Sequence, residues 1–372
     1  MSKYIWQMDS WPHMRWDSNE LMLPLGKTRL AQGQLHARSE QLGIELYAKQ
    51  MEEEVYSTAA IEGAKLDRTQ IRSSVGRRLG IRTAGMINPD RNVDGLVQVL
   101  LDAAQNYNQK LSSKRLKGWQ AALFPTGYSE FDKIDTGDWR KTTSSMQVVS
   151  GAPEKETVHF EAPPANRLQK EISAFLSWFN SPAENIDGII RAAHAHLYFV
   201  TIHPFDDGNG RIARAVSDLA LAQDEQKSSR LYSISTQILS ERREYYDILE
   251  RTQRGNGDIT NWLIWFLNCM LKAINSANKQ IENAWEKANL WERMSDISLN
   301  TRQKKSINKL SESGRNGVQI TNTKYRQMTK TTRETAKRDL TDLVKKGVLR
   351  KNPGGGRSTS YSLVWPDQKK RK

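Results

Sequence analysis

The stretch that decides the fold is His203–Arg214, which reads HPFDDGNGRIAR. Segments with helical apolar spacing flank it, one ending near Ile202 and the other beginning near Gly210. Gly208 and Gly210 permit backbone conformations that other residues avoid, so consecutive N–H groups can point at one anion where the second helix begins. The loop therefore predicts a phosphate-binding site at a helix N-terminus.

The side chains of the same stretch fit that ligand. Arg211 and Arg214 lie on one helical face, where guanidinium groups can hold phosphate oxygens. Asp207 offers the hard oxygen that Mg²⁺ prefers, and His203 precedes the loop as a candidate base. A DGNG turn or two arginines three residues apart is ordinary sequence when it occurs alone. Their combination within twelve residues indicates a functional site.

This stretch matches every defined position of H-x-F-x-[D/E]-G-N-G-R-x-x-R, the motif of the Fic family. The resemblance implies a mainly α protein with a Fic-type helical core. It also implies a protein adenylyltransferase, which moves AMP from ATP to a Ser, Thr or Tyr hydroxyl of a target protein or of itself and releases pyrophosphate.

The resemblance gives each motif side chain a role. His203 would deprotonate the incoming hydroxyl, Phe205 would anchor the loop, and Asp207 would hold Mg²⁺ between the α- and β-phosphates of ATP. Arg211 and Arg214 would hold the β- and γ-phosphates. Three residues would form the anion hole: Gly208, Asn209 and Gly210.

Two further segments resemble parts of the same family. Strand-favouring residues 146–149 and 157–160 predict a hairpin. Its position resembles that of the family's flap, which implies that Val148, Val149, Ser150 and Gly151 would align a target's backbone by strand pairing. The stretch holding Tyr245, Tyr246 and Gln253 resembles the adenosine-contacting helix, although other members have Asn where this chain has Gln253. Ordinary aromatic packing is the alternative for Tyr245.

His194 and His196 precede the motif as HAH and raise the question of a metal site with His203. Six residues separate His196 from His203, and no further His or Cys gathers nearby. We therefore expect both histidines to pack in the core or to support the site.

Thr58-x-x-x-Glu62-Gly63 resembles the inhibitory motif [S/T]-x-x-x-E-[G/N] of the Fic family. The resemblance implies that Glu62 pairs with Arg214 and keeps the γ-phosphate from its productive place, because a carboxylate and a phosphate compete for one guanidinium. The alternative is a solvated helix end with Gly63 as its cap.

Apolar periodicity predicts the remaining architecture. Residues 1–40 are rich in Trp and look irregular, so we expect their aromatic rings to insert between other elements; they resemble the Trp-rich domain that precedes some bacterial Fic cores. Helices are predicted over 39–61, 90–107, 111–123, 167–180, 186–200, 211–223, 241–254 and 259–292.

The charge of the chain is concentrated at its end. Of 372 residues, 56 are Lys or Arg and 42 are Asp or Glu. Residues 1–300 hold 36 basic and 37 acidic side chains, a net of −1, whereas residues 301–372 hold 20 and 5, a net of +15. A uniformly basic protein is excluded, and the charged segment predicts a separate domain from residue 298 onward.

Residues 301–365 have the pattern of a winged helix-turn-helix: helices over 301–312, 321–327 and 331–346, then two strands. Such a third helix enters the major groove of DNA. Thr332, Arg333 and Lys337 would face the DNA from that helix, and Arg357 from the wing. A protein-docking domain with solvated lysines is the alternative.

The sequence thus divides into 1–110, a Trp-rich and inhibitory-helix region, 111–297, a catalytic core, and 298–372, a winged-helix domain. Cys269 is the single cysteine, which excludes an intrachain disulfide, and the longest apolar run is too short for a bilayer. We expect a cytoplasmic protein. Three alternatives for the function stay open: a DNA-binding regulator that senses nucleotide without transferring it, transfer of another nucleotide, and removal of AMP. A homodimer also stays open.

Overall fold

The computed structural model describes residues 4–39, 43–81, 85–129, 131–141, 146–150, 157–181, 186–312, 314, 319–353 and 359–366. The chain forms two compact units, Met1–Asn275 and Ser276–Lys372. Helix α11 (Thr260–Arg293) contributes residues to both. The residue where we expect the last domain to begin, 298, lies inside the second unit, after α11.

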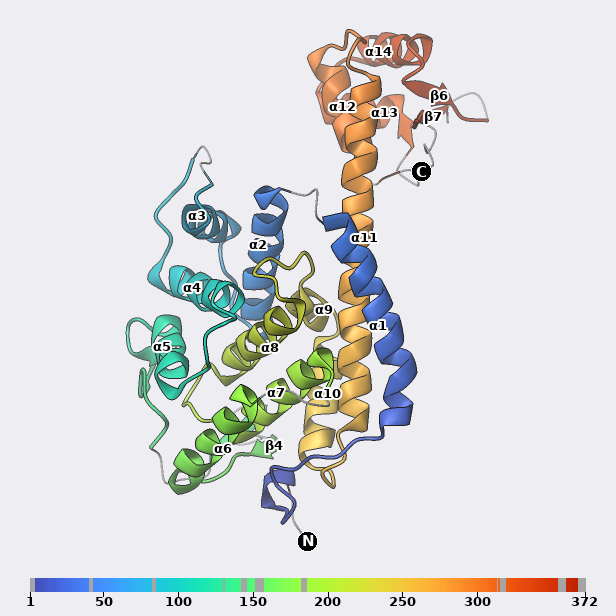
Figure 1. Cartoon of the computed structure of the whole chain (residues 1–372). Helices are drawn as coiled ribbons and strands as arrows, with labels where there is room; N and C mark the ends of the chain where they lie inside the picture. The colour runs from blue at the N-terminus through green and yellow to red at the C-terminus, as the bar shows by residue number, and fades with distance from the viewer. Residues whose placement is uncertain are drawn as a thin grey trace. The chain divides into compact units, whose positions relative to one another are not determined.

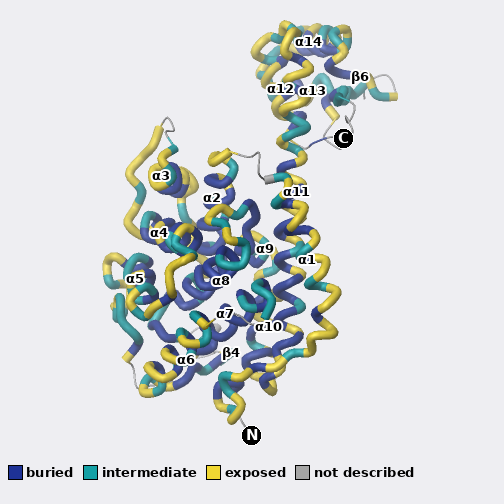
Figure 2. The backbone as a smooth tube through the Cα atoms, viewed as in Figure 1, coloured by how far each residue is buried: buried dark blue, intermediate teal, exposed yellow. Residues whose placement is uncertain are grey.

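Two buried helices form the centre of the first unit, α7 (Gly188–Ile202) and α8 (Asn209–Glu225). They pack along each other and are buried over most of their lengths (Figure 2). Three helices pack on α8: α2 (Ile44–Ile61), α4 (Arg91–Gln105) and α5 (Ser113–Leu123). Helix α6 (Leu168–Asn180) packs on α7 (Figure 1). The motif that joins α7 to α8 is therefore held from several sides.

The remaining elements of this unit surround that centre. Helices α3 (Arg68–Arg78) and α9 (Ile234–Ser240) contact α2, and α10 (Arg242–Gln253) contacts α9. The 3₁₀ turns are η1 (Ile5–Gln7) and η2 (Ala165–Arg167). Two antiparallel hairpins pair β1 (Tyr128–Ser129) with β2 (Asp132–Lys133) and β3 (Gln147–Ser150) with β4 (Thr157–Glu161).

The predicted helices of the first unit are confirmed, with ends within two residues of the expectation except that α2 begins at Ile44. Their starts follow ordinary capping chemistry. The Ser112 hydroxyl accepts from Arg115 N (3.2 Å) at the start of α5, and the Asp187 carboxylate accepts from Ile189 N (2.8 Å) at the start of α7. Helices α3 and α9 and the β1–β2 hairpin were not predicted.

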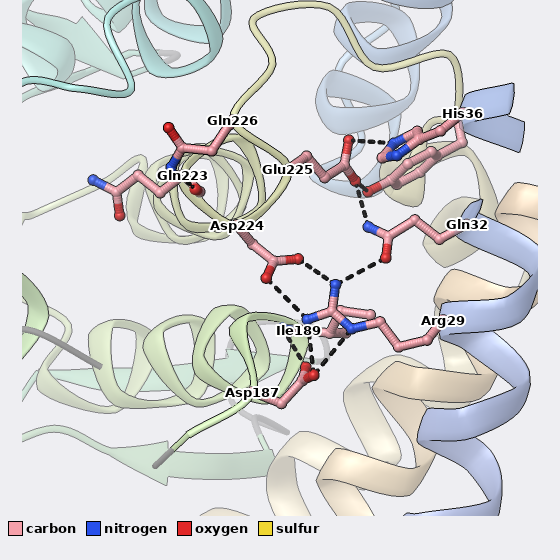
Figure 3. A network of polar contacts seen from close by, with 10 residues as sticks. Arg29, Gln32, His36, Asp187, Ile189, Gln223, Asp224, Glu225 and Gln226 are labelled. Carbon is pink, nitrogen blue, oxygen red and sulfur yellow. Dashed lines mark hydrogen bonds and ion pairs between the residues drawn. The ribbon is translucent and has the colours of Figure 1, made fainter. Parts of the chain in front are cut away.

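The expected irregular structure over residues 1–40 is wrong for Ser18–Ser39, which form helix α1. Its apolar residues follow no clear helical period and Pro24 lies inside it, so the local pattern hid the helix. Contacts with distant residues stabilise it instead. The Arg29 guanidinium bonds Asp187 (Nε–Oδ2, 3.0 Å) and Asp224 (Nη2–Oδ1, 2.9 Å), as Figure 3 shows. Asp187 caps α7 and Asp224 lies near the end of α8, so α1 is tied to both central helices.

The tryptophans near the N-terminus insert between other elements, as predicted. The Trp6 indole donates to a backbone carbonyl of β4 (2.7 Å). The Trp11 ring lies edge-on to Tyr198 of α7 (5.0 Å between centroids), and Trp16 lies edge-on to His194 of the same helix (5.9 Å). The N-terminal segment thus packs on α7 and on the hairpin that was predicted as the flap.

Besides the end of α11, the described part of the second unit contains three helices and a small sheet. The helices are α12 (Thr301–Ser311), α13 (Asn322–Thr329) and α14 (Arg333–Lys345). The antiparallel sheet has the order β5 (Ile320–Thr321), β7 (Ser360–Leu363), β6 (Leu349–Lys351). Leu340 and Leu343 of α14 are buried in the core of this unit. The three predicted helices and two strands are present, and β5 is an addition.

No helix in the described part of the chain is both long enough and apolar enough to cross a membrane.

Candidate active site

The motif loop begins where α7 ends. His203 takes the left-handed conformation (φ 50°) and its N–H donates to Phe199 O (3.1 Å). Its Nδ1 lies 3.2 Å from Val200 O. Because a carbonyl oxygen only accepts, Nδ1 carries the proton and Nε2 is the basic nitrogen. Burial lowers the pKa of His203 to about 4, so the ring is neutral at pH 7.

A buried arginine that the sequence gave no reason to select holds this turn. Arg140 is 2% exposed, and its Nε donates to His203 O (2.8 Å) while its Nη2 donates to Pro163 O. The backbone N–H of Arg140 donates to Pro204 O (3.0 Å). The arginine therefore joins the motif loop to the segment that follows β4. It lies 63 residues from His203, so spacing offered no signal.

Asn209 closes the loop with its side chain. Its Oδ1 accepts from Phe205 N (3.0 Å) and its Nδ2 donates to Phe205 O (2.8 Å). The Phe205 ring is fully buried near Trp139 (4.8 Å between centroids), as expected for an anchor. Both polar atoms of the Asn209 amide thus bond the Phe205 backbone, so this side chain holds the loop closed.

Gly208 is required by geometry. It adopts φ 88° at the start of α8, and a Cβ there would lie 3.0 Å from the Phe124 ring. The adjacent Asp207 accepts from Gly208 N (2.5 Å) through Oδ1 and from the Ser129 hydroxyl through Oδ2. Its side chain is 44% exposed, so the carboxylate is oriented and still open to a cation.

Two arginines of α8 follow the loop. The Arg211 guanidinium lies over the Phe124 ring (4.8 Å), and burial lowers its pKa. Arg214 is 3% exposed and donates two hydrogen bonds to Thr58, one from Nε to Oγ1 (2.6 Å) and one from Nη2 to the carbonyl oxygen (3.0 Å). Burial lowers the pKa of Arg214, but Glu62, together with Tyr245 and Tyr246, outweighs that effect, so the pKa is raised.

Glu62 lies at the end of α2 and reaches the same guanidinium. Its Oε1 accepts from Arg214 Nη2 at 2.7 Å. The same oxygen lies where a Cβ on Gly210 would be, so it occupies the space at the start of α8. Helix α10 fixes the end of α2, because Arg242 Nε (2.6 Å) and Tyr246 Oη (3.3 Å) donate to Ile61 O.

The predicted nucleotide-contacting residues of α10 lie in different surroundings. Tyr245 is 1% exposed and its hydroxyl contacts His196 Nε2 (2.9 Å), which fits the packing alternative. Tyr246 is 38% exposed beside Glu62. Gln253 is buried and donates to Thr201 Oγ1 (3.2 Å). Of the three, Tyr246 has the accessible side chain.

The HAH histidines are part of the core. His194 lies against the Trp178 ring (4.5 Å between centroids), and His196 is hydrogen-bonded to Ser217 (3.2 Å) as well as to Tyr245. Burial lowers their pKa values to about 4 and about 3. Within the described ranges, no group of three or more His, Cys, Asp or Glu side chains could hold a metal ion.

The predicted flap is a two-stranded hairpin. Val148 and Val149 lie in β3, whose register with β4 shifts between them, and Ser150 pairs with Thr157; Gly151 lies outside the described residues. Helix α10 holds β4, because Arg254 donates to Val158 O (2.5 Å) and His159 O (2.9 Å). No other described strand pairs with β3, so its outer edge has no strand neighbour in that part of the chain.

The arrangement fits an anion at the start of α8. Arg211 Nε and Arg214 Nη1 are buried, and neither has a hydrogen-bond partner among the described residues. Buried N–H donors of arginine are costly to leave unpaired, and phosphate oxygens would pair them. The Asp207 carboxylate, whose side chain is 44% exposed, likewise fits Mg²⁺ bound together with phosphates.

Three of the four predicted DNA-facing residues, Thr332, Arg333 and Lys337, lie in the first turns of α14 or at its cap. Thr332 caps this helix by accepting from Thr335 N (3.2 Å). Arg333 and Lys337 are exposed. Arg357 lies outside the described residues.

Two parts of the chain resemble known protein families. Residues 110–221 match the Fic/DOC family. The chain carries a Fic/DOC domain. Residues 4–81 match a domain of unknown function, DUF4172. The Fic/DOC match includes most of the motif loop's supporting elements, from α5 to α8.

Relatives of the chain support this assignment. The protein adenylyltransferase fic-1 of Caenorhabditis elegans is 29% identical over 178 residues, which are 45% of this chain and 31% of the relative. The uridine 5′-monophosphate transferase of Xanthomonas campestris pv. campestris is 32% identical over 105 residues, 27% of this chain and 18% of the relative. The chain spans about a third of the length of the adenylyltransferases it matches.

A solved structure has a similar fold. The crystal structure of a Fic family protein from Desulfovibrio desulfuricans covers 93% of this chain and 96% of its own, with a TM-score of 0.55 and 18% identity. At that identity, the likeness extends to the fold alone.

Proposed function

We propose that this protein is an adenylyltransferase that moves AMP from ATP to a hydroxyl of a protein and that Glu62 inhibits it. One observation carries the proposal: Arg214, the last residue of a complete Fic motif, is paired with a carboxylate from another helix. A phosphate would need the same guanidinium.

The chain's own side chains account for the transfer. His203 Nε2 accepts the proton of the incoming hydroxyl, and Arg140 keeps that ring at the end of α7 by holding its backbone. Arg211, Arg214 and the N–H groups at the start of α8 orient the phosphates. Asp207 would hold Mg²⁺, which supplies charge neutralisation at the phosphates when it is bound.

The hairpin supports a protein as the acceptor. The outer edge of β3 offers backbone N–H and C=O groups to an extended peptide, which would align its hydroxyl by strand pairing. Since α10 holds β4 through Arg254, the hairpin is fixed on one side while β3 is available on the other.

Transfer of UMP in place of AMP is the specific alternative for the reaction. The Xanthomonas relative is named a uridine 5′-monophosphate transferase. The residues that we propose to hold the phosphates would serve a nucleotide with either base. Transfer of UMP would use the same His203, Asp207 and Arg214.

The basic charge of the second unit favours a negatively charged binding partner. Its three helices and sheet have the order of a winged helix-turn-helix, and Arg333 and Lys337 are exposed at the start of α14. We propose that this helix binds DNA. If about six phosphates are neutralised, affinity falls by roughly a thousandfold between 50 and 200 mM salt. Arg333→Ala would weaken binding, whereas a protein-docking domain would show no DNA binding at low salt.

Labelled ATP and UTP distinguish these functions. We expect the Glu62→Gly variant with Mg²⁺ to acquire AMP, found as a mass increase on itself or on lysate proteins, and the Glu62→Gly, His203→Ala variant to acquire none. UMP on the protein would favour the second nucleotide. ATP binding without transfer in the Glu62→Gly variant would contradict an enzyme and favour a nucleotide-sensing regulator.

A further inference from the structure

The small hairpin of β1 and β2 presents two exposed aromatic side chains. Tyr128 pairs with Lys133 across the hairpin, and Ser129 pairs with Asp132. Phe131 lies in the turn between the strands and is 96% exposed, while Tyr128 is 49% exposed. Phe131 is the most exposed large hydrophobic side chain among the described residues. Because single apolar residues are common on protein surfaces, its position in the fold decides whether it has a role.

Two hydrogen bonds attach the hairpin to the motif loop. The Ser129 hydroxyl donates to Asp207 Oδ2. The backbone N–H of Asp135, two residues after β2, donates to Asp206 Oδ2 (2.9 Å). These bonds hold the hairpin beside the carboxylate that we assign to Mg²⁺.

The residues that lead into β1 contact the same loop. The Phe124 ring would lie 3.0 Å from a Cβ on Gly208, and the Arg211 guanidinium lies over it (4.8 Å). The backbone carbonyl of Phe124 accepts from Gly127 N (3.0 Å), the residue before β1. The chain on both sides of the hairpin is therefore fixed at the candidate active site, whereas Phe131 at its turn is open to solvent.

Chain geometry places Phe131 within reach of a bound acceptor. Phe131 is two residues from Ser129, so their Cα atoms are at most about 7 Å apart. An extended peptide advances about 3.3 Å per residue. A side chain within roughly four residues of the modified hydroxyl can therefore reach the Phe131 ring.

We propose that Phe131 binds an apolar side chain of the protein that accepts AMP, within about four residues of the modified hydroxyl. A solvent-exposed aromatic ring gains free energy when apolar groups cover it, and a neighbouring aliphatic or aromatic side chain of the acceptor provides that cover. The inference rests on the proposed transfer to a protein and adds a selection for the sequence around the acceptor hydroxyl.

A library of fifteen-residue peptides, each with one central Ser, Thr or Tyr, tests the proposal with the Glu62→Gly enzyme and labelled ATP. We expect the most strongly labelled peptides to share an aliphatic or aromatic residue at one position within four residues of the centre. Phe131→Ser should abolish this preference and raise the KM for the best peptide at least tenfold, since burial of a Phe side chain favours binding roughly ten- to hundredfold.

The other kinetic constants separate docking from catalysis. Phe131→Ser should leave kcat and the KM for ATP unchanged, because the hydrogen bonds to Asp206 and Asp207 come from other residues of the hairpin segment. Phe131→Leu keeps an apolar surface and should retain the peptide preference. Leu30→Ser is the matched control, because Leu30 of α1 is another exposed apolar residue (66%), and it should change none of these values.

Each contrary result has its own meaning. Peptide labelling that is indifferent to Phe131→Ser overturns the inference and leaves the transfer intact. A preference for Lys or Arg overturns the apolar partner and indicates a cation above the ring. Labelling of lysate proteins but of no peptide overturns the selection by local sequence. A weaker affinity for ATP in Phe131→Ser overturns docking and shows that the hairpin acts through Asp207. Transfer to no acceptor at all refutes the proposed function, and this inference with it.

Discussion

Replacing Glu62 by glycine removes the carboxylate that lies against Arg214 and Gly210. The substitution leaves the two bonds from Arg214 to Thr58 in place, so the guanidinium keeps its position. It also leaves the bonds from Arg242 and Tyr246 to Ile61 O, which fix the end of α2. We therefore expect the start of α8 to open without displacement of the helix.

The size of the effect follows from one charged hydrogen bond. Glu62 Oε1 and Arg214 Nη2 are 2.7 Å apart, with the arginine 3% and the glutamate 32% exposed. A hydrogen bond between charged groups contributes about 1.5–3 kcal/mol. A ligand that must first displace this contact binds more weakly by the same free energy, so its removal should raise transfer roughly 10- to 150-fold.

The assay is the initial rate of AMP transfer at subsaturating ATP, with Glu62→Gln and Ala60→Gly beside Glu62→Gly. Glu62→Gln keeps the volume near Gly210 but loses the charge, so its rate should lie between wild type and Glu62→Gly. Ala60→Gly adds glycine flexibility near the same helix end without touching Arg214, and should leave the rate unchanged. Equal rates for wild type and Glu62→Gly, or an equal rise for Ala60→Gly, would refute the reasoning.

Three further outcomes are expected. Because burial lowers the pKa of His203 to about 4, the rate of the Glu62→Gly enzyme should stay level from pH 8 to 6 and fall only near pH 4; a midpoint near 6.5 would contradict this. Asn209→Ala removes both bonds to Phe205 and should lower transfer at least tenfold in the Glu62→Gly background, measured beside its thermal unfolding; an unchanged rate would show that the clamp is dispensable. Arg29→Ala leaves two half-buried carboxylates, Asp187 and Asp224, without their ion-pair partner, and should lower the free energy of unfolding in urea by about 1–2 kcal/mol relative to Lys27→Ala; equal values would show that these ion pairs do not stabilise the unit.

Local patterns were enough for most of the helices. Helix α4 has an apolar stripe and α5 and α7 have capping side chains, so their bounds could be predicted within two residues. Helix α1 could not, because its stability comes from Arg29 and its neighbours bonding the ends of α7 and α8. Helix α3 has few apolar residues and α9 has only seven residues in all, and both pack against α2.

The candidate site likewise has features that the sequence predicted and features that it did not. The motif itself predicted a loop between two helices with Phe205 as anchor, and the structure has that loop. The role of Arg140 was hidden, because an isolated arginine carries no periodic or spacing signal. The two hydrogen bonds between the Asn209 side chain and the Phe205 backbone could not be predicted either. An asparagine in a Gly-rich loop can bind an anion or hold the loop closed, and the sequence does not distinguish these roles.

The sequence by itself determined which residue types share the motif loop: a histidine, a carboxylate, glycines and arginines within twelve residues, because residue types and spacings are local properties of the chain. The tertiary structure decided which distant residues contact those of the motif loop. Glu62 and Arg214 are 152 residues apart, and their contact exists because α2 packs on α8 while α10 holds its end. Spacing along the chain records which residues share a helix face, whereas only folding determines which faces meet.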